Sequence, residues 1–197
     1  MDKADVSQTI LETERLLLRP WKKEDVDDFF EYASVPGVGE MAGWSHHETK
    51  SESEAILKRF MEQKKTFAII YKSNQKVIGS LGIESVKDHA GEELHDLMGR
   101  ELGYVLSKEY WGQGLMAEAV KRVVDWCFSE LQYDFLLCGN YIENRQSARV
   151  QQKAGFQPYQ QMETAASSQE IKILEMRILM NLKEKQNENR NDCRNCR

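Results

Sequence analysis

The chain has 197 residues, of which 41% are hydrophobic and 30% are charged, and its formal net charge is -5. This size and composition fit one globular domain. An acidic chain is a poor partner for nucleic acid, because phosphate contacts need clustered Lys and Arg. No apolar stretch is long enough to cross a membrane, and residues 1–10 lack the apolar core of a signal peptide. We therefore expect a soluble, cytoplasmic protein.

The first predicted elements are one strand and two helices. Residues 11–19 have the apolar pattern of a strand, and residues 23–33 place apolar side chains at helical spacing. Residues 34–47 contain one Pro, three Gly and no regular apolar spacing, which predicts a loop. Ser51 and Glu54 form a candidate capping box for the second helix.

The middle of the chain predicts three strands and a long helix. Residues 67–71 and 77–86 are typical of strands joined by a polar turn. Residues 87–99 predict a polar loop, and residues 101–106 predict the third strand. Apolar residues at helical spacing then predict a helix that ends near Leu131.

The last predicted elements are a buried strand over residues 135–140, a helix over 143–154, and strands over 156–162 and 171–182. The complete order is strand, helix, helix, three strands, helix, strand, helix and two strands. This order predicts a sheet covered by helices.

Three segments make up the predicted domain organisation. We expect an N-terminal arm over residues 1–10, one domain over residues 11–182 and a disordered polar tail over residues 183–197. Cys193 and Cys196 form a C-x-x-C pair in this tail. A structural zinc site needs four ligands, so the pair alone predicts no metal site, and its role stays open.

A glycine-rich turn, YWGQGLMA at residues 110–117, is the first candidate functional motif. Gly112 and Gly114 allow a tight turn before a helix, whose first N–H groups and partial positive charge favour an anion. A P-loop would need Lys and then Ser or Thr after Gly114. Gly112, Gly114 and Ala117 satisfy the dinucleotide-binding pattern G-x-G-x-x-G/A, but no predicted strand leads directly into it. The turn predicts a phosphate-bearing ligand of another class.

A second motif, NRQSARVQQKAGF, covers residues 144–156. Together the two motifs resemble the GNAT superfamily of acyl-CoA-dependent N-acetyltransferases, and most of all its branch of ribosomal-protein N-terminal acetyltransferases (RimJ/RimL type). That branch carries N-x-x-S-x-x-V-x-x-K-x-G-F, filled here by Asn144, Ser147, Val150, Lys153, Gly155 and Phe156. Residues 111–116 occupy the pyrophosphate motif Q/R-x-x-G-x-G/A, with Trp111 and Met116 as departures from it.

The resemblance includes residues 13–21 and 101–106 and spans 11–182. It implies an α/β (α+β) fold with a mixed, mostly antiparallel central sheet flanked by helices. The strands at about 101–106 and 135–140 are expected to splay apart around the pantetheine arm of acetyl-CoA, the co-substrate, with no metal. Lys153 is placed either at a cofactor phosphate or as a solvated charge. The implied cofactor-binding residues are Val105, Leu106, Gly112, Gln113, Gly114, Leu115, Met116, Ala117, Asn144 and Lys153.

Acetyl transfer to an amine needs a neutral nucleophile and stabilised charge on the carbonyl oxygen and the thiolate. Glu101 is the predicted base, acting directly or through water, with pairing to Arg100 as the structural alternative. The backbone N–H of Val105 is the donor that the resemblance suggests for the oxyanion. The tyrosine that other branches carry is replaced by Gln151. Ser147 is therefore the candidate contact for the thiolate, with helix capping or packing as its alternative.

The acceptor side is predicted in the loop over residues 35–47, with Trp44 and His47 as substrate-binding residues. The predicted function is acetyl transfer from acetyl-CoA to a primary amine, such as a protein N-terminal Ala or Ser. Small amines and antibiotics are the alternative acceptors. A non-catalytic acyl-CoA sensor on the same fold is a second hypothesis, because Gln151 replaces the tyrosine. The chain is expected to be a monomer or a homodimer.

Overall fold

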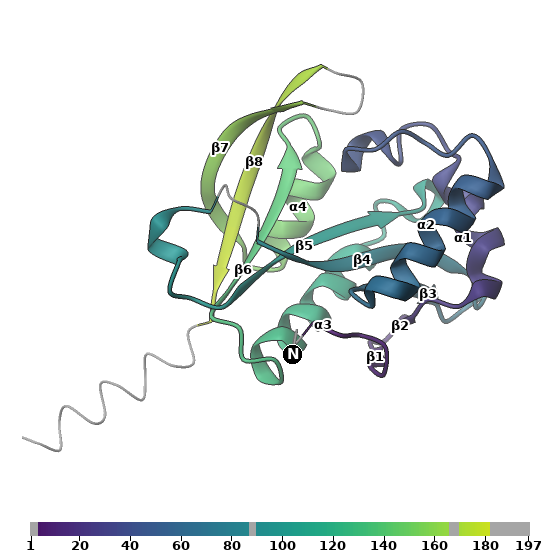
Figure 1. The fold of residues 1–197 in the computed structure, drawn as a ribbon, viewed down its shortest axis with the longest axis horizontal. Helices are drawn as coiled ribbons and strands as arrows, with labels where there is room; N and C mark the ends of the chain where they lie inside the picture. Colours follow the sequence, from purple (N-terminus) through teal and green to yellow (C-terminus); the bar gives the residue numbers. More distant parts are fainter. Residues whose placement is uncertain (1–3, 87–89, 166–169, 182–197) are drawn as a thin grey trace, which may run out of the picture.

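The computed structural model describes residues 4–86, 90–165 and 170–181. Within this part of the chain, strands form one sheet in the order β1-β2-β3-β4-β5-β6-β8-β7 (Figure 1). The strands are β1 (Leu11–Glu12), β2 (Leu16–Pro20), β3 (Thr66–Tyr71), β4 (Val77–Ser85), β5 (Gly99–Leu106), β6 (Phe135–Tyr141), β7 (Gln157–Ala165) and β8 (Ile171–Met180). The α-helices are α1 (Val26–Ala33), α2 (Lys50–Gln63), α3 (Leu115–Ser129) and α4 (Arg145–Lys153).

The sheet is mixed, and its one parallel pair among the described strands lies at its centre. β5 and β6 run parallel and are paired from Gly99 opposite Phe135 to Leu102 opposite Cys138. β5 continues to Leu106 beyond the last pair, so the two strands separate there. The neighbouring described pairs are antiparallel. The mostly antiparallel sheet and the splay between β5 and β6 are therefore confirmed.

Helices cover both faces of the sheet because the central strands are apolar on both sides. On one face, α3 buries Ala119, Val120 and Val123 in a core shared with Leu81 and Leu102. The helices α1 and α2 lie on the other face (Figure 1). They pack aromatic and aliphatic side chains against β3 and β4. This two-sided core holds the ends of β5 and β6 in place.

The single strand predicted over residues 11–19 is two short strands in the structure. β1 and β2 form a hairpin, with Leu11 opposite Leu18. The turn between them is held by Glu118 of α3, which accepts hydrogen bonds from Thr13 Oγ1 at 2.5 Å and from the Arg15 N–H at 3.0 Å. The prediction of one strand was wrong because its break depends on a residue far along the chain.

The cap of α2 also differs from the prediction. The helix begins at Lys50, and its cap is Thr49, whose Oγ1 accepts the Glu52 N–H at 3.3 Å. Ser51 and Glu54 lie inside the helix. The same capping chemistry therefore operates two residues earlier than expected.

The segment predicted as an arm contributes to the core where it is described. Ala4 and Val6 are 0% and 1% exposed, and the Val6 N–H donates to the Lys64 carbonyl at 2.8 Å. The predicted tail, with Cys193 and Cys196, lies outside the described residues. Among the described helices, none has the length and apolar character needed to span a bilayer.

Candidate active site

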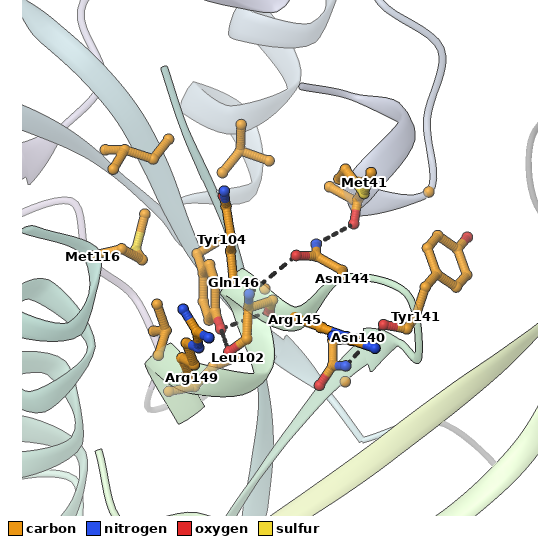
Figure 2. Close-up of a pocket in the computed structure, with 18 of the residues that line it drawn as sticks. Met41, Leu102, Tyr104, Met116, Asn140, Tyr141, Asn144, Arg145, Gln146 and Arg149 are labelled. Carbon is orange, nitrogen blue, oxygen red and sulfur yellow. Dashed lines mark hydrogen bonds between the residues drawn. The ribbon is translucent and has the colours of Figure 1, made fainter. Parts of the chain in front are cut away.

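An open cleft of about 810 Å³ lies where β5 and β6 separate. Its walls come from these strands, the glycine turn with the start of α3, helix α4 and the loop before α2 (Figure 2). The residues predicted from the resemblance that line it are Glu101, Val105, Leu106, Gly112, Gly114, Leu115, Met116, Ala117, Asn144, Ser147 and Lys153. Gln113, Trp44 and His47 lie outside its lining.

The glycine turn presents the start of α3 to the cleft. Gly112 and Gly114 have φ values of 77° and 78°, in the left-handed region that favours glycine. Gly114 directly precedes the helix and has no side chain with which to cap it. The first backbone N–H groups of α3 lack intrahelical acceptors and carry the positive end of the helix dipole. This geometry suits a phosphate.

Side-chain hydrogen bonds brace the turn. Arg15 donates to the Gln113 carbonyl at 3.1 Å and pairs with Glu118 of α3 at 2.6 Å. The side chain of Gln113 donates to the Glu109 carbonyl at 3.2 Å, along the turn itself. Trp111, the departure from the pyrophosphate motif, donates its indole N–H to the Leu106 carbonyl at 2.8 Å. Trp111 therefore ties the turn to the end of β5.

Two carboxylates lie on neighbouring strands at the cleft. Glu84 of β4 is directly opposite Glu101 of β5, and both line the cleft. Side chains directly opposite each other on adjacent strands project to the same face of the sheet, and like charges placed so favour a cation between or beside them. This part of the site is suited to an ammonium group.

A hydrogen-bonded cluster joins β5 to α4. The Tyr104 hydroxyl lies 2.8 Å from Ser147 Oγ and 3.2 Å from the Ser147 carbonyl. Gln151 donates from Nε2 to Ser147 Oγ at 3.3 Å. Burial raises the pKa of Tyr104 well above its usual value of 10.0. Tyr104 is not among the predicted site residues, although strand alternation places it on the same face as Leu102, toward α3 and α4.

Both ends of the Asn144 side-chain amide form hydrogen bonds within the protein. Its Oδ1 caps α4 by accepting the Ser147 N–H at 3.0 Å, and its Nδ2 donates to the Met41 carbonyl at 3.2 Å (Figure 2). The amide thus holds the start of α4 against the loop before α2. Asn140 offers a different group: it is 4% exposed, lines the cleft, and its Oδ1 has no partner among the described residues. A buried amide oxygen of this kind fits an N–H donor such as a pantetheine amide.

Trp44 and His47 lie in the loop before α2 and outside the lining of the cleft. His47 is 8% exposed, its Nδ1 lies 2.7 Å from Ser53 Oγ, and its ring is 5.3 Å from that of Phe29. The Trp44 ring lies 5.1 Å from the His47 ring. Burial lowers the pKa of His47. Among the described residues, no group of three or more His, Cys, Asp or Glu is placed to hold a metal.

Three cations follow one side of α4. Arg145, Arg149 and Lys153 are spaced four residues apart, and all three are exposed and line the cleft. Figure 2 shows Arg145 and Arg149 on α4. Residues at this spacing share one helix face. None of them forms an ion pair with a carboxylate of the described residues. The spacing was visible in the sequence, but only Lys153 was singled out there.

A mixed sheet whose central parallel strands separate over a cleft, with a glycine turn and a helix N-terminus at one wall, defines the class of acyl-CoA-dependent N-acetyltransferases. The chain belongs to the acetyltransferase (GNAT) domain family, whose model matches residues 15–157. It is therefore an acetyl-CoA-dependent acyltransferase.

Known proteins agree with this assignment. An uncharacterised N-acetyltransferase, p20 of Bacillus licheniformis, is 28% identical over 152 residues, which cover 75% of this chain and 82% of that protein. The ribosomal-protein-S5-alanine acetyltransferase of Vibrio fischeri superposes with a TM-score of 0.73 at 19% identity, covering 89% and 98% of the two chains. Spermidine N-acetyltransferase of Vibrio cholerae, solved with CoA and spermine, superposes with a TM-score of 0.70 at 13% identity. The superposition covers 86% of this chain and 97% of that chain.

Proposed function

We propose that the cleft at the splay transfers an acetyl group from acetyl-CoA to a primary amine, with Glu101 on the amine side and Ser147 on the thiolate side. The observation that carries the proposal is that both side chains line one cleft, from β5 and α4, at the point where β5 and β6 separate. The proposed catalytic domain is the one predicted over residues 11–182, and Ala4 and Val6 of the preceding segment are buried in the same core.

Acetyl-CoA is proposed to bind with its pyrophosphate at the N–H groups of the glycine turn and the first turn of α3. Arg149 and Lys153 supply cations from the opposite wall. The pantetheine arm lies between the separated strands, where Asn140 offers an amide oxygen to an N–H group. The main chain of β5 around Val105 is the proposed donor to the carbonyl oxygen of the thioester.

The proposed reaction is direct transfer. The nitrogen of the neutral amine attacks the acetyl carbon, the carbon–sulfur bond breaks, and the electron pair leaves on sulfur. Glu101 attracts the cationic amine and receives its proton, directly or through water. Ser147 donates a hydrogen bond to the thiolate. A free thiol has a pKa of about 8.5, so a hydrogen bond is enough to make it a tolerable leaving group.

The acceptor is proposed to be a primary amine with positive charge, because Glu84 and Glu101 face the same part of the cleft. A protein N-terminal Ala or Ser and a polyamine both meet this requirement, and structural neighbours include enzymes named for each kind of acceptor.

Release of free thiol from acetyl-CoA tests the proposal. N-terminal Ala and Ser peptides, polyamines and aminoglycosides are offered in parallel, and the acetylated product is identified by mass spectrometry. We expect turnover with at least one class. Tight acetyl-CoA binding with no thiol release for any acceptor would instead indicate a sensor.

A further inference from the structure

Three polar side chains meet where β5 and α4 face each other across the cleft. Tyr104 comes from the strand, and Ser147 and Gln151 lie one helical turn apart on α4. Tyr104 and Ser147 line the cleft, whereas Gln151 is 0% exposed behind them. Figure 2 shows Tyr104 directed at the first turn of α4. The cluster therefore has one open side, and that side belongs to the cleft.

The hydrogen-bonding capacity of Ser147 decides what the cluster does. A serine hydroxyl has one proton and two lone pairs, and an amide nitrogen such as Gln151 Nε2 only donates. Gln151 therefore occupies one lone pair of Ser147 Oγ. The Tyr104 hydroxyl is 2.8 Å from Oγ and 3.2 Å from the Ser147 carbonyl, and the shorter contact favours donation to Oγ. If Tyr104 is the donor in the 2.8 Å contact, both lone pairs of Oγ are filled, and the serine proton is the one group left for a partner in the cleft.

We propose that Tyr104 and Gln151 are positioning residues that make the Ser147 hydroxyl a one-directional hydrogen-bond donor to the sulfur of CoA. The inference rests on the proposed function, which places that sulfur beside Ser147. It adds two residues that act through Ser147 and do not touch the reacting atoms.

No proton is transferred within the cluster. As the carbon–sulfur bond breaks, the electron pair moves to sulfur, and the Ser147 proton strengthens its hydrogen bond to the thiolate while staying on the serine. The proton lost by the amine leaves through Glu101 or water. Tyr104 stays neutral throughout, because burial raises its pKa well above its usual value.

Gln151 separates this role from a structural one. Its Oε1 is buried and has no hydrogen-bond partner among the described residues. A buried polar atom without a partner lowers stability, so an apolar side chain of similar length is expected to be tolerated or to stabilise the fold. Gln151→Met should therefore keep or raise the melting temperature and still weaken the function of Ser147. If the role of Gln151 were only structural, Gln151→Met with a preserved melting temperature would not weaken the function of Ser147.

The primary test follows the thiol of bound CoA and needs no acceptor. The ultraviolet absorbance of the thiolate is titrated against pH for CoA bound to the full chain. We expect its pKa to lie below the free value of about 8.5. Ser147→Ala should raise the bound value by about one unit, and Tyr104→Phe and Gln151→Met by about half a unit each. In the Ser147→Ala background neither should add a further shift.

Two matched controls accompany the titration. Tyr159→Phe removes a phenol that is hydrogen-bonded to Glu93 at 2.6 Å outside the cleft, and Gln152→Met makes the same change on the exposed side of α4. Both should leave the bound thiol pKa unchanged. Once an acceptor is known, Tyr104→Phe should lower kcat by about tenfold with little change in the KM for acetyl-CoA, whereas Ser147→Thr should retain more activity than Ser147→Ala.

The outcomes distinguish the inference from the proposed function. A thiol pKa that rises in Ser147→Ala but not in Tyr104→Phe or Gln151→Met would overturn the inference and leave the function intact. Additive shifts in the double variants would also overturn it, because Tyr104 and Gln151 would then act independently of Ser147. Failure of the wild-type chain to bind CoA would refute both.

Discussion

Gly114 holds a left-handed backbone where the turn meets α3, with φ at 78°. A side chain there would meet only Arg15, at 3.9 Å, so conformation rather than space requires glycine. Left-handed geometry costs a residue with a Cβ about 1–2 kcal/mol. The strain falls on the N–H groups proposed to bind pyrophosphate.

Gly114→Glu is expected to weaken acetyl-CoA binding by more than about tenfold, because it strains the turn and places a carboxylate where the phosphate charge is proposed to lie. Isothermal calorimetry measures the loss. Gly37→Glu is the matched control: its φ is 91°, no atom lies within 4 Å of the added Cβ, and it is outside the cleft. Equal losses in both variants would show a general effect on stability and contradict the placement.

Glu101→Gln is expected to lower turnover while leaving acetyl-CoA affinity nearly unchanged. A general base contributes about 10²–10⁴-fold, and less for an acceptor that is already partly neutral. An α-amine has a pKa of about 7.7–8.0, so the defect should shrink as pH rises toward that value. Initial rates from pH 6 to pH 9 against one confirmed acceptor measure it.

Glu84→Gln provides the comparison, because it removes the same charge from the strand position opposite Glu101. If Glu101 acted only through its negative charge, both variants would show the same dependence of turnover on pH. Wild-type rates for Glu101→Gln at low pH would show that this carboxylate is structural.

At the scale of elements, the β1–β2 hairpin is fastened to α3 by Glu118. Its carboxylate accepts from Thr13 Oγ1 and from the backbone and guanidinium of Arg15. Burial acts against this charge, but the donors outweigh it and lower the pKa of Glu118 below its ordinary value of 4.5. Since Arg15 also holds the Gln113 carbonyl, the hairpin supports the glycine turn.

Glu118→Gln is expected to lower the free energy of unfolding at pH 7 by about 2 kcal/mol, through loss of hydrogen bonds to a charged group. The folded pKa of Glu118 lies below the unfolded one. Its stabilisation is therefore present above the unfolded value and is lost as pH falls through the folded value. Urea unfolding at pH 7 and pH 3.5 should show the variant approaching wild type at the lower pH. Glu62→Gln, on the exposed side of α2, should show no such trend.

Local patterns predicted most elements, and the failures have physical causes at long range. The break after Glu12 needs Glu118, which is more than a hundred residues away in the chain. In the sequence, Tyr104 is one residue of a predicted strand, and nothing nearby marks it as part of a site. Its hydroxyl reaches Ser147 only because β5 packs against α4. The sequence predicts His47 as a substrate-binding residue, but the loop buries its side chain against Ser53.

Over the whole molecule, charge is separated along the cleft. The chain carries a net charge of -5, yet Arg145, Arg149 and Lys153 gather on α4, while Glu84 and Glu101 lie across from them on the sheet. An anionic cofactor and a cationic acceptor would thus meet opposite charges in one site. Attraction of acetyl-CoA must come from local cations, because the field of the whole chain opposes it.

Arg149→Gln is expected to weaken CoA binding and to reduce its dependence on salt, since it removes one cation that is proposed to face the phosphates. Titrations at several salt concentrations, with CoA and with dephospho-CoA, measure both effects. A loss with CoA alone would assign Arg149 to the 3′-phosphate, and a loss with both ligands would assign it to the pyrophosphate. Arg59→Gln, on α2, changes the net charge equally but lies outside the cleft. If the two variants lose the same affinity and the same salt dependence, binding responds to net charge, and the α4 cations make no direct contact with CoA.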